Sequence, residues 1–354
     1  MMKLRLIASF AAFIASGSAV ALAEQGTTRI TVLATGGTIA RAQAEEGGYG
    51  YKSGSFDIKD LISSVPNLDK LAIISGEQVV NIGSQDMNND VWLTLARRVS
   101  EVVASPDTDA VLITHGTDTM EETSYFLSLV AKTTKPIIMV GSMRPATAIS
   151  ADGPSNLFNG VSAAINPGAV GRGVMVVLND QIHYARNVAK LSTTDVQTFQ
   201  SGNRGPAGLT NTGAITWFAM PERRQGMTSE FSIEGLQSLP RVDILYGNAG
   251  MNADLIEAAV RLGAKGLVIA GVGDGNMTTP ALEAITAAAK AGVVVVRSTR
   301  LPSGIVYRNN EVDDDALGLV ASGELNPAKS RVLLMLALTR TTDVSSIQAM
   351  FNEY

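Results

Sequence analysis

The first candidate for chemistry is Thr38, which stands in the segment 34–40 (ATGGTIA) directly after a run of strand-forming residues. Two glycines allow a sharp turn and a close backbone approach to a ligand, so the strand would present the Thr38 hydroxyl at its carboxyl end. That position suits a nucleophile, although a threonine there could equally cap the following helix. A phosphate-binding loop is disfavoured, because the segment lacks both G-x-G-x-x-G and the lysine of a Walker motif.

A second group of candidates lies in the segment 114–123 (THGTDTMEET). Thr117 and Asp118 end a strand-like run, where a carboxylate could hold the ammonium of a ligand while the threonine orients a water or the nucleophile. Asp118 could equally be a second helix cap. Thr119 and Glu122 have the spacing of a capping box, which predicts a structural role for Thr119.

Two further polar segments complete the set. The segment 81–87 (NIGSQDM), with Ser84 and Gln85, follows a strand and offers neutral donors that suit a carboxylate ligand, although an ordinary polar turn explains it as well. Lys190 lies among hydroxyl side chains and could serve as a base if burial lowered its pKa from the usual value of about 10.4. Most lysines are solvated, so this role depends on its surroundings.

The composition excludes several other chemistries. The 354 residues contain no cysteine, which excludes a thiol nucleophile, thiolate metal sites and disulfides. His115 and His183 are the two histidines, so a three-histidine zinc site is impossible, and we interpret His115 as a packed, hydrogen-bonded side chain. The formal charge of −5 argues against a nucleic-acid binder and favours a small-molecule partner.

Short apolar runs rich in β-branched residues precede these polar clusters and alternate with amphipathic stretches. This pattern predicts a mostly parallel sheet with helices on both faces. In such sheets ligands bind beyond the carboxyl ends of the strands, so the polar clusters should share one edge. The predicted strands are 30–34, 111–114, 137–140, 174–178, 242–246, 267–270 and 293–296, the last of them ending before a polar pair, Arg297 and Ser298.

The chain divides into three parts. Residues 1–23 have the basic start, apolar run and small-residue cleavage pattern of a signal peptide, which predicts a periplasmic or secreted protein that no membrane helix retains. A polar break at 219–240 predicts a linker. We therefore expect an α/β protein with a larger, flavodoxin-like N-terminal domain (24–218) and a smaller C-terminal α/β domain (241–354), each with a parallel or mostly parallel sheet.

Taken together, these segments resemble the secreted type II bacterial L-asparaginases from about residue 30 to residue 354. The resemblance rests on ATGGTIA at 34–40 and ITHGTDTMEET at 113–123, reinforced by GEQVVNIGSQDM at 76–87 and SADG at 150–153. It implies hydrolysis of L-asparagine to L-aspartate and ammonia through a threonine nucleophile and an acyl-enzyme, without a metal or organic cofactor, and with no nucleic acid or membrane partner.

The resemblance also implies roles for individual residues. Thr38 matches the nucleophile and Tyr51 the loop tyrosine that assists it, with Tyr49 as a competing match. Thr117, Lys190 and Asp118 match a second cluster that assists proton transfer and the attacking water. Whether Tyr51 or Lys190 takes the proton of the nucleophile is open at this stage.

The same resemblance implies how the substrate is recognised. Ser84 and Gln85 match residues that bind the α-carboxylate and neighbouring groups, and Asp118 matches the ligand of the α-ammonium. Asn276 and Glu311 match residues that reach the site from a neighbouring subunit, so the resemblance implies a homotetramer built from intimate dimers. The Ser84–Gln85 pair with Asn276 is typical of the asparagine-preferring branch, which predicts weaker activity on L-glutamine.

The rival class is a secreted amino-acid-binding protein of two α/β domains that closes on its ligand without reacting. Such a protein would share the secretion signal, the acidic charge and the Asp and Ser ligands. It would not need paired threonines or a lysine at the site.

Overall fold

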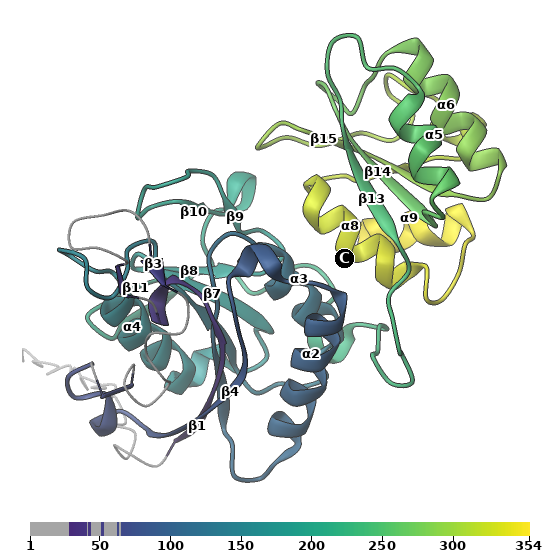
Figure 1. Cartoon of the computed structure of the whole chain (residues 1–354). Helices are drawn as coiled ribbons and strands as arrows, with labels where there is room; N and C mark the ends of the chain where they lie inside the picture. Colours follow the sequence, from purple (N-terminus) through teal and green to yellow (C-terminus); the bar gives the residue numbers. More distant parts are fainter. Residues whose placement is uncertain (1–27, 41, 44–50, 53–61, 64) are drawn as a thin grey trace, which may run out of the picture.

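The structure is a computed structural model that describes residues 28–40, 42–43, 51–52, 62–63 and 65–354, folded as two α/β domains (Figure 1). The predicted signal peptide lies outside the described residues. The last strand of the first sheet ends at Trp217 and the first strand of the second sheet begins at Val242. The mixed α/β, two-domain fold expected from the sequence is confirmed.

The first domain is built on an eight-stranded sheet in the order β12-β11-β8-β7-β6-β5-β1-β4. Its parallel part consists of β4 (Ile73–Ile82), β1 (Arg29–Gly36), β5 (Ala110–Thr114), β6 (Ile137–Val140) and β7 (Val174–Leu178). An antiparallel extension comes next, with β8 (Gln181–Tyr184), β11 (Gly208–Asn211) and β12 (Ala214–Trp217). The sheet is therefore mostly parallel, as the sequence predicted.

The apolar runs form strands because helices cover both faces of the parallel part. Helices α2 (Asn89–Ala104) and α3 (Met120–Val130) pack on one face and α4 (Gly153–Ile165) on the other (Figure 1). Every residue of β5, β6 and β7 is consequently buried. A strand covered on both sides needs apolar residues at every position instead of at alternate ones.

The second domain has a four-stranded, fully parallel sheet of β13 (Val242–Tyr246), β14 (Gly266–Gly271), β15 (Val294–Thr299) and β16 (Val320–Ala321). Its strands are connected through α5 (Asp254–Arg261), α6 (Thr279–Lys290) and α7 (Asp314–Leu317). Helices α8 (Pro327–Ala337) and α9 (Val344–Glu353) lie on the side that faces the first domain (Figure 1).

One expectation for this sheet was wrong. Arg297 was expected in a polar cluster after the strand, but it lies inside β15 and is fully buried. Its guanidinium donates to both carboxylate oxygens of Asp314, with Nε 2.6 Å from Oδ1 and Nη2 2.7 Å from Oδ2. A buried charge is tolerated when it is paired and hydrogen-bonded in this way, and sequence alone did not reveal the partner.

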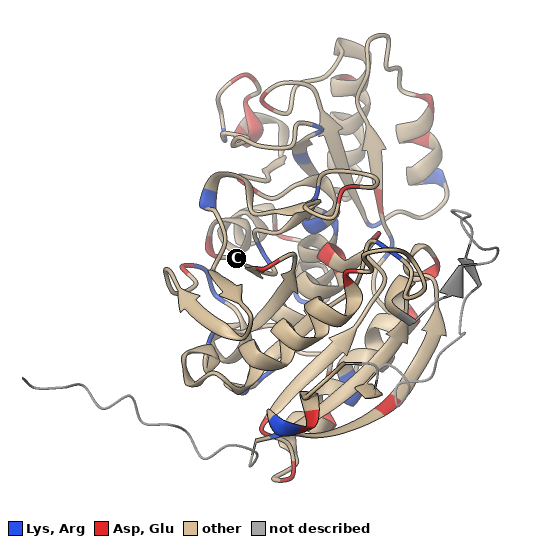
Figure 2. Cartoon of the chain, turned by 90° about the vertical axis from the view of Figure 1, so that its left-hand side faces the viewer, with Lys and Arg blue, Asp and Glu red and all other residues tan. Residues whose placement is uncertain are grey.

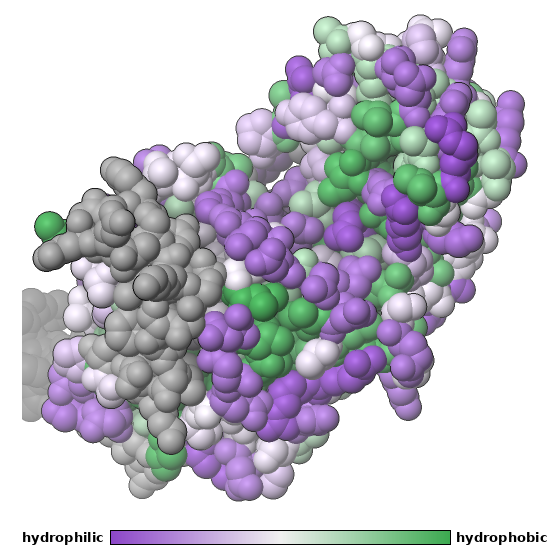
Figure 3. Space-filling model, viewed as in Figure 1, coloured by the Kyte–Doolittle hydropathy of each residue, from purple (hydrophilic) through white to green (hydrophobic). Residues whose placement is uncertain are grey.

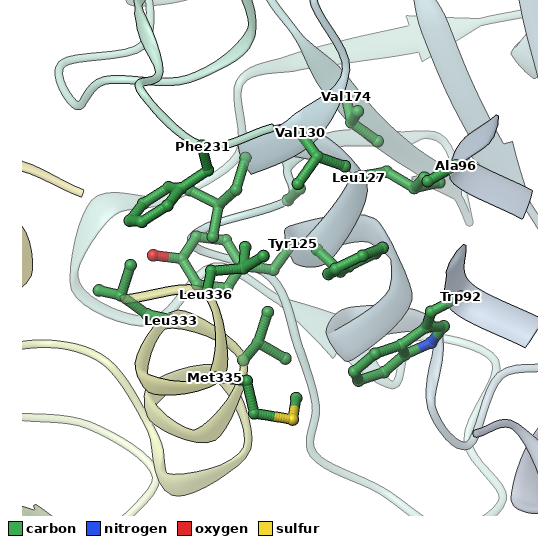
Figure 4. Packing of buried hydrophobic residues seen from close by; sticks show 14 of the residues in the cluster. Trp92, Ala96, Tyr125, Leu127, Val130, Val174, Phe231, Leu333, Met335 and Leu336 are labelled. Atoms are coloured by element: carbon green, nitrogen blue, oxygen red, sulfur yellow. The ribbon is translucent and has the colours of Figure 1, made fainter. Parts of the chain in front are cut away.

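The two domains share one hydrophobic core. Tyr125 of α3 packs with Leu333 and Leu336 of α8, and Phe231 of the connecting segment closes the same cluster (Figure 4). Acidic and basic positions are interspersed along the boundary around this core (Figure 2). The position of α8 is therefore coupled to that of α3, the helix that begins beside Asp118.

The remaining elements are short. Two-stranded sheets are formed by β2 (Ala42–Gln43) with β3 (Tyr51–Lys52), and by β9 (Ala189–Lys190) with β10 (Phe199–Gln200). Single 3-10 turns occur at η1 (Thr38–Ala40), η2 (Leu68–Lys70), η3 (Ser84–Asp86), η4 (Pro167–Ala169), η5 (Gly202–Arg204) and η6 (Gly226–Thr228). Within the described ranges, no helix has the length and apolarity needed to cross a membrane.

Candidate active site

The candidate site lies where the strand order of the first sheet reverses. Strand β1 lies between β5 and β4, next to the edge of the sheet: the chain moves from it to β4 on one side and then returns to β5 on the other. The loops after β1 and β5 therefore diverge at the carboxyl ends of the strands, which is the usual ligand position in such sheets. Thr38 begins η1 directly after β1, Ser84 begins η3 after β4, and Thr117 and Asp118 follow β5.

Glycines allow these three loops to touch. A Cβ atom on Gly37, whose φ is +89°, would lie 2.4 Å from the backbone nitrogen of Gly116. A Cβ atom on Gly116 would in turn lie 2.5 Å from the Oγ atom of Ser84. No side chain fits at either position, because ordinary carbon contacts need well over 3 Å. The backbone contact between Gly37 and Gly116 brings the loop that carries Thr38 against the loop that carries Thr117.

Thr117, Lys190 and Asp118 form one hydrogen-bonded cluster. The Lys190 ammonium donates to Thr117 Oγ1 at 2.9 Å and to Asp118 Oδ1 at 2.7 Å. The Lys190 side chain is 15% exposed and that of Asp118 is 59% exposed, while Thr117 is buried. Because the Thr117 hydroxyl accepts from Lys190, it keeps its own proton to donate to a water or a substrate.

Ser84 joins the loops after β4 and β5. Its Oγ accepts the backbone N–H of Asp118 at 3.1 Å, and its carbonyl oxygen accepts the hydroxyl of Thr119 at 2.7 Å. The predicted capping box is therefore wrong: the Thr119 side chain caps no helical N–H group and instead reaches across to Ser84. The buried Ser84 hydroxyl retains a proton that it can donate to a ligand.

The histidines are packed side chains. His115 is completely buried and its Nδ1 lies 2.6 Å from the carbonyl oxygen of Gly116. His183 is buried in the same way, with Nδ1 2.7 Å from Ser201 Oγ. Burial lowers the pKa of each imidazole to about 4, so both are neutral at neutral pH. The contact between His115 and Gly116 supports the loop that carries Thr117.

The structure gives less information about three other predicted site residues. Gln85 is exposed, and its Nε2 donates to Asp86 Oδ2 at 3.2 Å. The backbone of Tyr51 lies in β3, opposite Gln43 of β2, whereas its side chain is outside the described part of the structure. Tyr49 lies outside the described residues altogether.

Asn276 and Glu311 lie in the second domain, away from this cluster. Asn276 Nδ2 donates to Glu311 Oε2, and among the described residues no hydrogen bond or ion pair connects either side chain to Thr117 or Lys190. Arg297 supports the loop that ends at Asn276, because its Nη1 donates to the carbonyl oxygens of residues 274 and 275 at 3.0 and 3.2 Å. The single chain thus presents the pair at the carboxyl edge of its second sheet.

The contacts that hold α3 in place were not predicted from the sequence. Glu121 and Glu122, in the first turn of α3, face two basic residues of α8: Glu121 Oε2 lies 3.7 Å from Lys329 Nζ, and Glu122 Oε2 lies 3.7 Å from Arg331 Nη1. Burial raises the pKa of Glu122, and Arg331 opposes that rise. The sequence signal for these contacts was two basic residues inside the otherwise apolar stretch of α8.

The arrangement can carry out acyl transfer on an amino acid. In the described part of the chain no acceptor is found for the backbone N–H of Thr117, which leaves it available to an oxyanion. Asp118 offers a carboxylate and Ser84 a hydroxyl, which suits opposite ends of a zwitterion. The described residues contain no group of three side chains placed to hold a metal ion.

Comparisons with known proteins find matches to both domains of this chain. The family model described as Asparaginase, N-terminal matches residues 29–223, and the Glutaminase/Asparaginase C-terminal domain model matches residues 241–351. The chain is 48% identical to L-asparaginase 2 of Escherichia coli (strain K12), over 96% of this chain and 95% of that protein. It is 48% identical to the probable periplasmic L-asparaginase of Haemophilus influenzae, over 92% and 93%, and 44% identical to the glutaminase-asparaginase of Pseudomonas fluorescens, over 92% and 90%.

Proposed function

Because this chain belongs to the asparaginase family through both of its domains, we propose that it hydrolyses L-asparagine to L-aspartate and ammonia, with weaker activity on L-glutamine. The observation that carries the proposal is the hydrogen-bonded cluster of Thr117, Lys190 and Asp118 beside the loop of Thr38. A protein that only binds an amino acid has no use for a lysine held against a second threonine.

The proposed reaction has two steps. The Thr38 hydroxyl oxygen attacks the side-chain amide carbon of asparagine and loses its proton, and the backbone N–H of Thr117 stabilises the oxyanion. The C–N bond then breaks, and the departing nitrogen takes up a proton and leaves as ammonia. Water attacks the resulting ester on Thr38, regenerates the hydroxyl and releases aspartate. Lys190 and Thr117 assist the proton transfers and orient the water, and Tyr51 assists Thr38.

Recognition uses opposite charges. Asp118 Oδ1 is bonded to Lys190, which leaves Oδ2 to accept the α-ammonium of the substrate. Ser84 and Gln85 donate to the α-carboxylate and its neighbouring groups. The Ser84 bond to the Asp118 backbone fixes the spacing between these two ligands, so the position of one end of the amino acid determines that of the other.

We further propose that the active assembly is a homotetramer of intimate dimers, in which Asn276 and Glu311 complete the site of a neighbouring subunit. Within the described part of one chain neither side chain is bonded to the cluster, which supports a contribution to the site of another subunit. Exposed apolar residues on the second domain support association, on the edge strand β13 (Ile244, Tyr246), on α5 (Leu255) and directly after it (Leu262). Figure 3 shows hydrophobic side chains gathered on the surface of this domain.

The shared site predicts complementation between two defective subunits. Glu311→Ala and Thr38→Ala proteins should each be impaired alone, because one lacks a substrate contact and the other the nucleophile. When the two are unfolded together and refolded, hybrid dimers should contain one intact site, so ammonia release should exceed the sum of the separately refolded proteins. Activity equal to that sum would reject the shared site.

We propose a periplasmic or secreted location after removal of residues 1–23, and domain limits at 24–218 and 241–354 with a linker at 219–240. One of the relatives is named as a periplasmic enzyme. The first family model ends at residue 223, inside the proposed linker, and the second begins at residue 241, directly after it.

The preference for asparagine is a separate prediction. Glutamine is longer than asparagine by one methylene. A difference of one methylene between two substrates changes kcat/KM by about 10- to 200-fold. We therefore expect kcat/KM for L-glutamine to be lower than for L-asparagine by about 100-fold. Competition between the two substrates, followed by separate quantification of aspartate and glutamate, gives this ratio directly. Comparable values would contradict the assignment of the Ser84–Gln85 pair to an asparagine-preferring site.

A further inference from the structure

The second domain contributes a buried lysine, Lys329, that contacts two segments next to the candidate site. Lys329 is in the first turn of α8, and its side chain is 3% exposed. Its ammonium donates to the carbonyl oxygen of Val188 and lies 3.7 Å from Glu121 Oε2. Asn326 is hydrogen-bonded to both residues of this ion pair. Its side-chain oxygen accepts the backbone N–H of Lys329 at 2.9 Å, and its Nδ2 donates to Glu121 Oε2 at 3.2 Å.

The Val188 contact matters because the strand that carries Lys190 begins at the next residue. Strand β9 (Ala189–Lys190) is not part of the eight-stranded sheet. It pairs with β10 alone, through two residue pairs. A strand with so little pairing depends on other contacts for its position. The Lys329 bond to the Val188 carbonyl is one of them, and it comes from the other domain.

The Glu121 contact reaches the other half of the cluster. Glu121 lies three residues after Asp118, in the first turn of α3. The Lys329 ammonium therefore touches both segments that meet at the candidate site, the one that supplies Lys190 and the one that supplies Thr117 and Asp118. A second ion pair, Arg186 Nη1 to Glu324 Oε2 at 3.4 Å, ties the segment before Val188 to the second domain as well.

Packing alone does not account for a lysine at this position. An ammonium taken out of water costs several kcal/mol, and well-packed apolar residues are often as stabilising as a buried ion pair. The cost is visible in the side chain itself, because burial lowers the pKa of Lys329 to about 8 while Glu121 opposes that change. The Lys329 ammonium supplies a hydrogen-bond donor to the Val188 carbonyl, which an apolar side chain cannot do.

We propose that Lys329 is a positioning residue for the hydrolysis, setting the distance between Lys190 and the Thr117–Asp118 pair from the second domain. This role rests on the proposed function of the site. A displacement of about 1 Å at a catalytic group can lower a rate by about 100-fold. Because β9 pairs with β10 through only two residue pairs, whereas α3 packs in the core along its length, loss of Lys329 should displace Lys190 and lower kcat more than it changes KM.

The absence of cysteine from the sequence allows a precise test. Lys329→Cys creates the single thiol of the chain, which can be alkylated in the unfolded protein before refolding. Bromoethylamine transfers an aminoethyl group to sulfur with loss of bromide and recreates the lysine shape and charge. Bromopropane gives an apolar side chain of the same length. Wild-type protein, carried through the same steps, is the reference.

The aminoethyl protein should recover most of the wild-type kcat on L-asparagine, and the propyl protein should be lower by about 10- to 100-fold with KM within about 3-fold. Arg331→Met is the matched control, because Arg331 also ties α8 to α3 but does not touch residues 186–190; its kcat should stay near that of wild type. Equal kcat for the propyl and aminoethyl proteins would overturn the proposal.

Hydrogen exchange gives a readout that does not need turnover. Amide exchange at residues 187–191 should be faster in the propyl protein than in the aminoethyl protein, while exchange in α3 should be the same in both. Unchanged exchange at 187–191 would overturn the positioning role even if no form were active, and inactive wild-type protein would separately reject the proposed function. If the propyl protein does not refold, Lys329→Met expressed directly replaces it in both measurements.

Discussion

Replacing Thr38 by alanine is expected to lower kcat on L-asparagine by about 10⁴-fold or more, because removal of a nucleophile leaves only the oxyanion donor and substrate binding. The substitution removes the hydroxyl and one methyl group and leaves the loop contact of Gly37 with Gly116 unchanged. The ligands Ser84 and Asp118 lie in loops that follow other strands, so affinity for L-aspartate should stay within about 3-fold. Steady-state ammonia release and calorimetric titration with L-aspartate measure the two effects.

Thr38→Ser is the matched control, since it keeps the hydroxyl and removes only a methyl group. It should retain far more activity than Thr38→Ala. A Thr38→Ala protein that keeps more than about a tenth of the wild-type kcat would show that another group attacks the amide, because losing a nucleophile costs orders of magnitude.

Lys190→Met is expected to lower kcat by about 10³-fold, within the range of general acid–base assistance. Methionine has nearly the length of lysine, so packing around β9 should survive, but Thr117 loses the donor at 2.9 Å and Asp118 the donor at 2.7 Å. The two bonds that orient the second threonine and the ammonium ligand disappear together. Steady-state kinetics on L-asparagine and a urea denaturation curve separate the loss of activity from a loss of stability.

Lys265→Met serves as the comparison for this variant, because Lys265 is exposed on the second domain, away from the cluster. Its kinetics should match those of the wild type. If Lys190→Met kept kcat within about 3-fold of wild type while remaining folded, the bond to Thr117 would be structural and the proposed proton transfers would need another group.

Strands β5, β6 and β7 could be predicted from the sequence because both of their faces are buried. Runs such as 137–140 and 174–178 are apolar at every position, and the structure places β6 and β7 on those residues. Strands β11 and β12 are exposed on one face and too short for a clear alternating pattern. Their residues therefore carry no comparable signal.

The polar contacts of the site were harder to predict, because they join residues far apart in the chain. The spacing of Thr119 and Glu122 fits a capping box, yet Ser84, 35 residues earlier, offers the Thr119 hydroxyl a carbonyl acceptor. Lys190 and Thr117 are 73 residues apart, and the two residue types alone did not show that they meet. Arg297 was misplaced for the same reason, since its partner Asp314 comes from a later helix.

The resemblance to the asparaginases predicted contacts that residue spacing alone did not predict. It matched Lys190 with Thr117 and Asp118, and the structure brings these three side chains into contact. It did not single out Lys329, because the role of that side chain depends on how α8 packs against α3 and on the course of β9. The two basic residues in the apolar stretch of α8 indicate buried contacts, but they do not identify the residues of the other domain that they meet.

The decisive experiment is product formation from L-asparagine by wild-type protein without residues 1–23. We expect continuous turnover that yields ammonia and L-aspartate in equal amounts, with no added metal or cofactor, and a slower reaction on L-glutamine. Tight binding of asparagine or aspartate without ammonia release would contradict it. In that case the Thr117–Lys190–Asp118 cluster would hold an amino acid and not hydrolyse one.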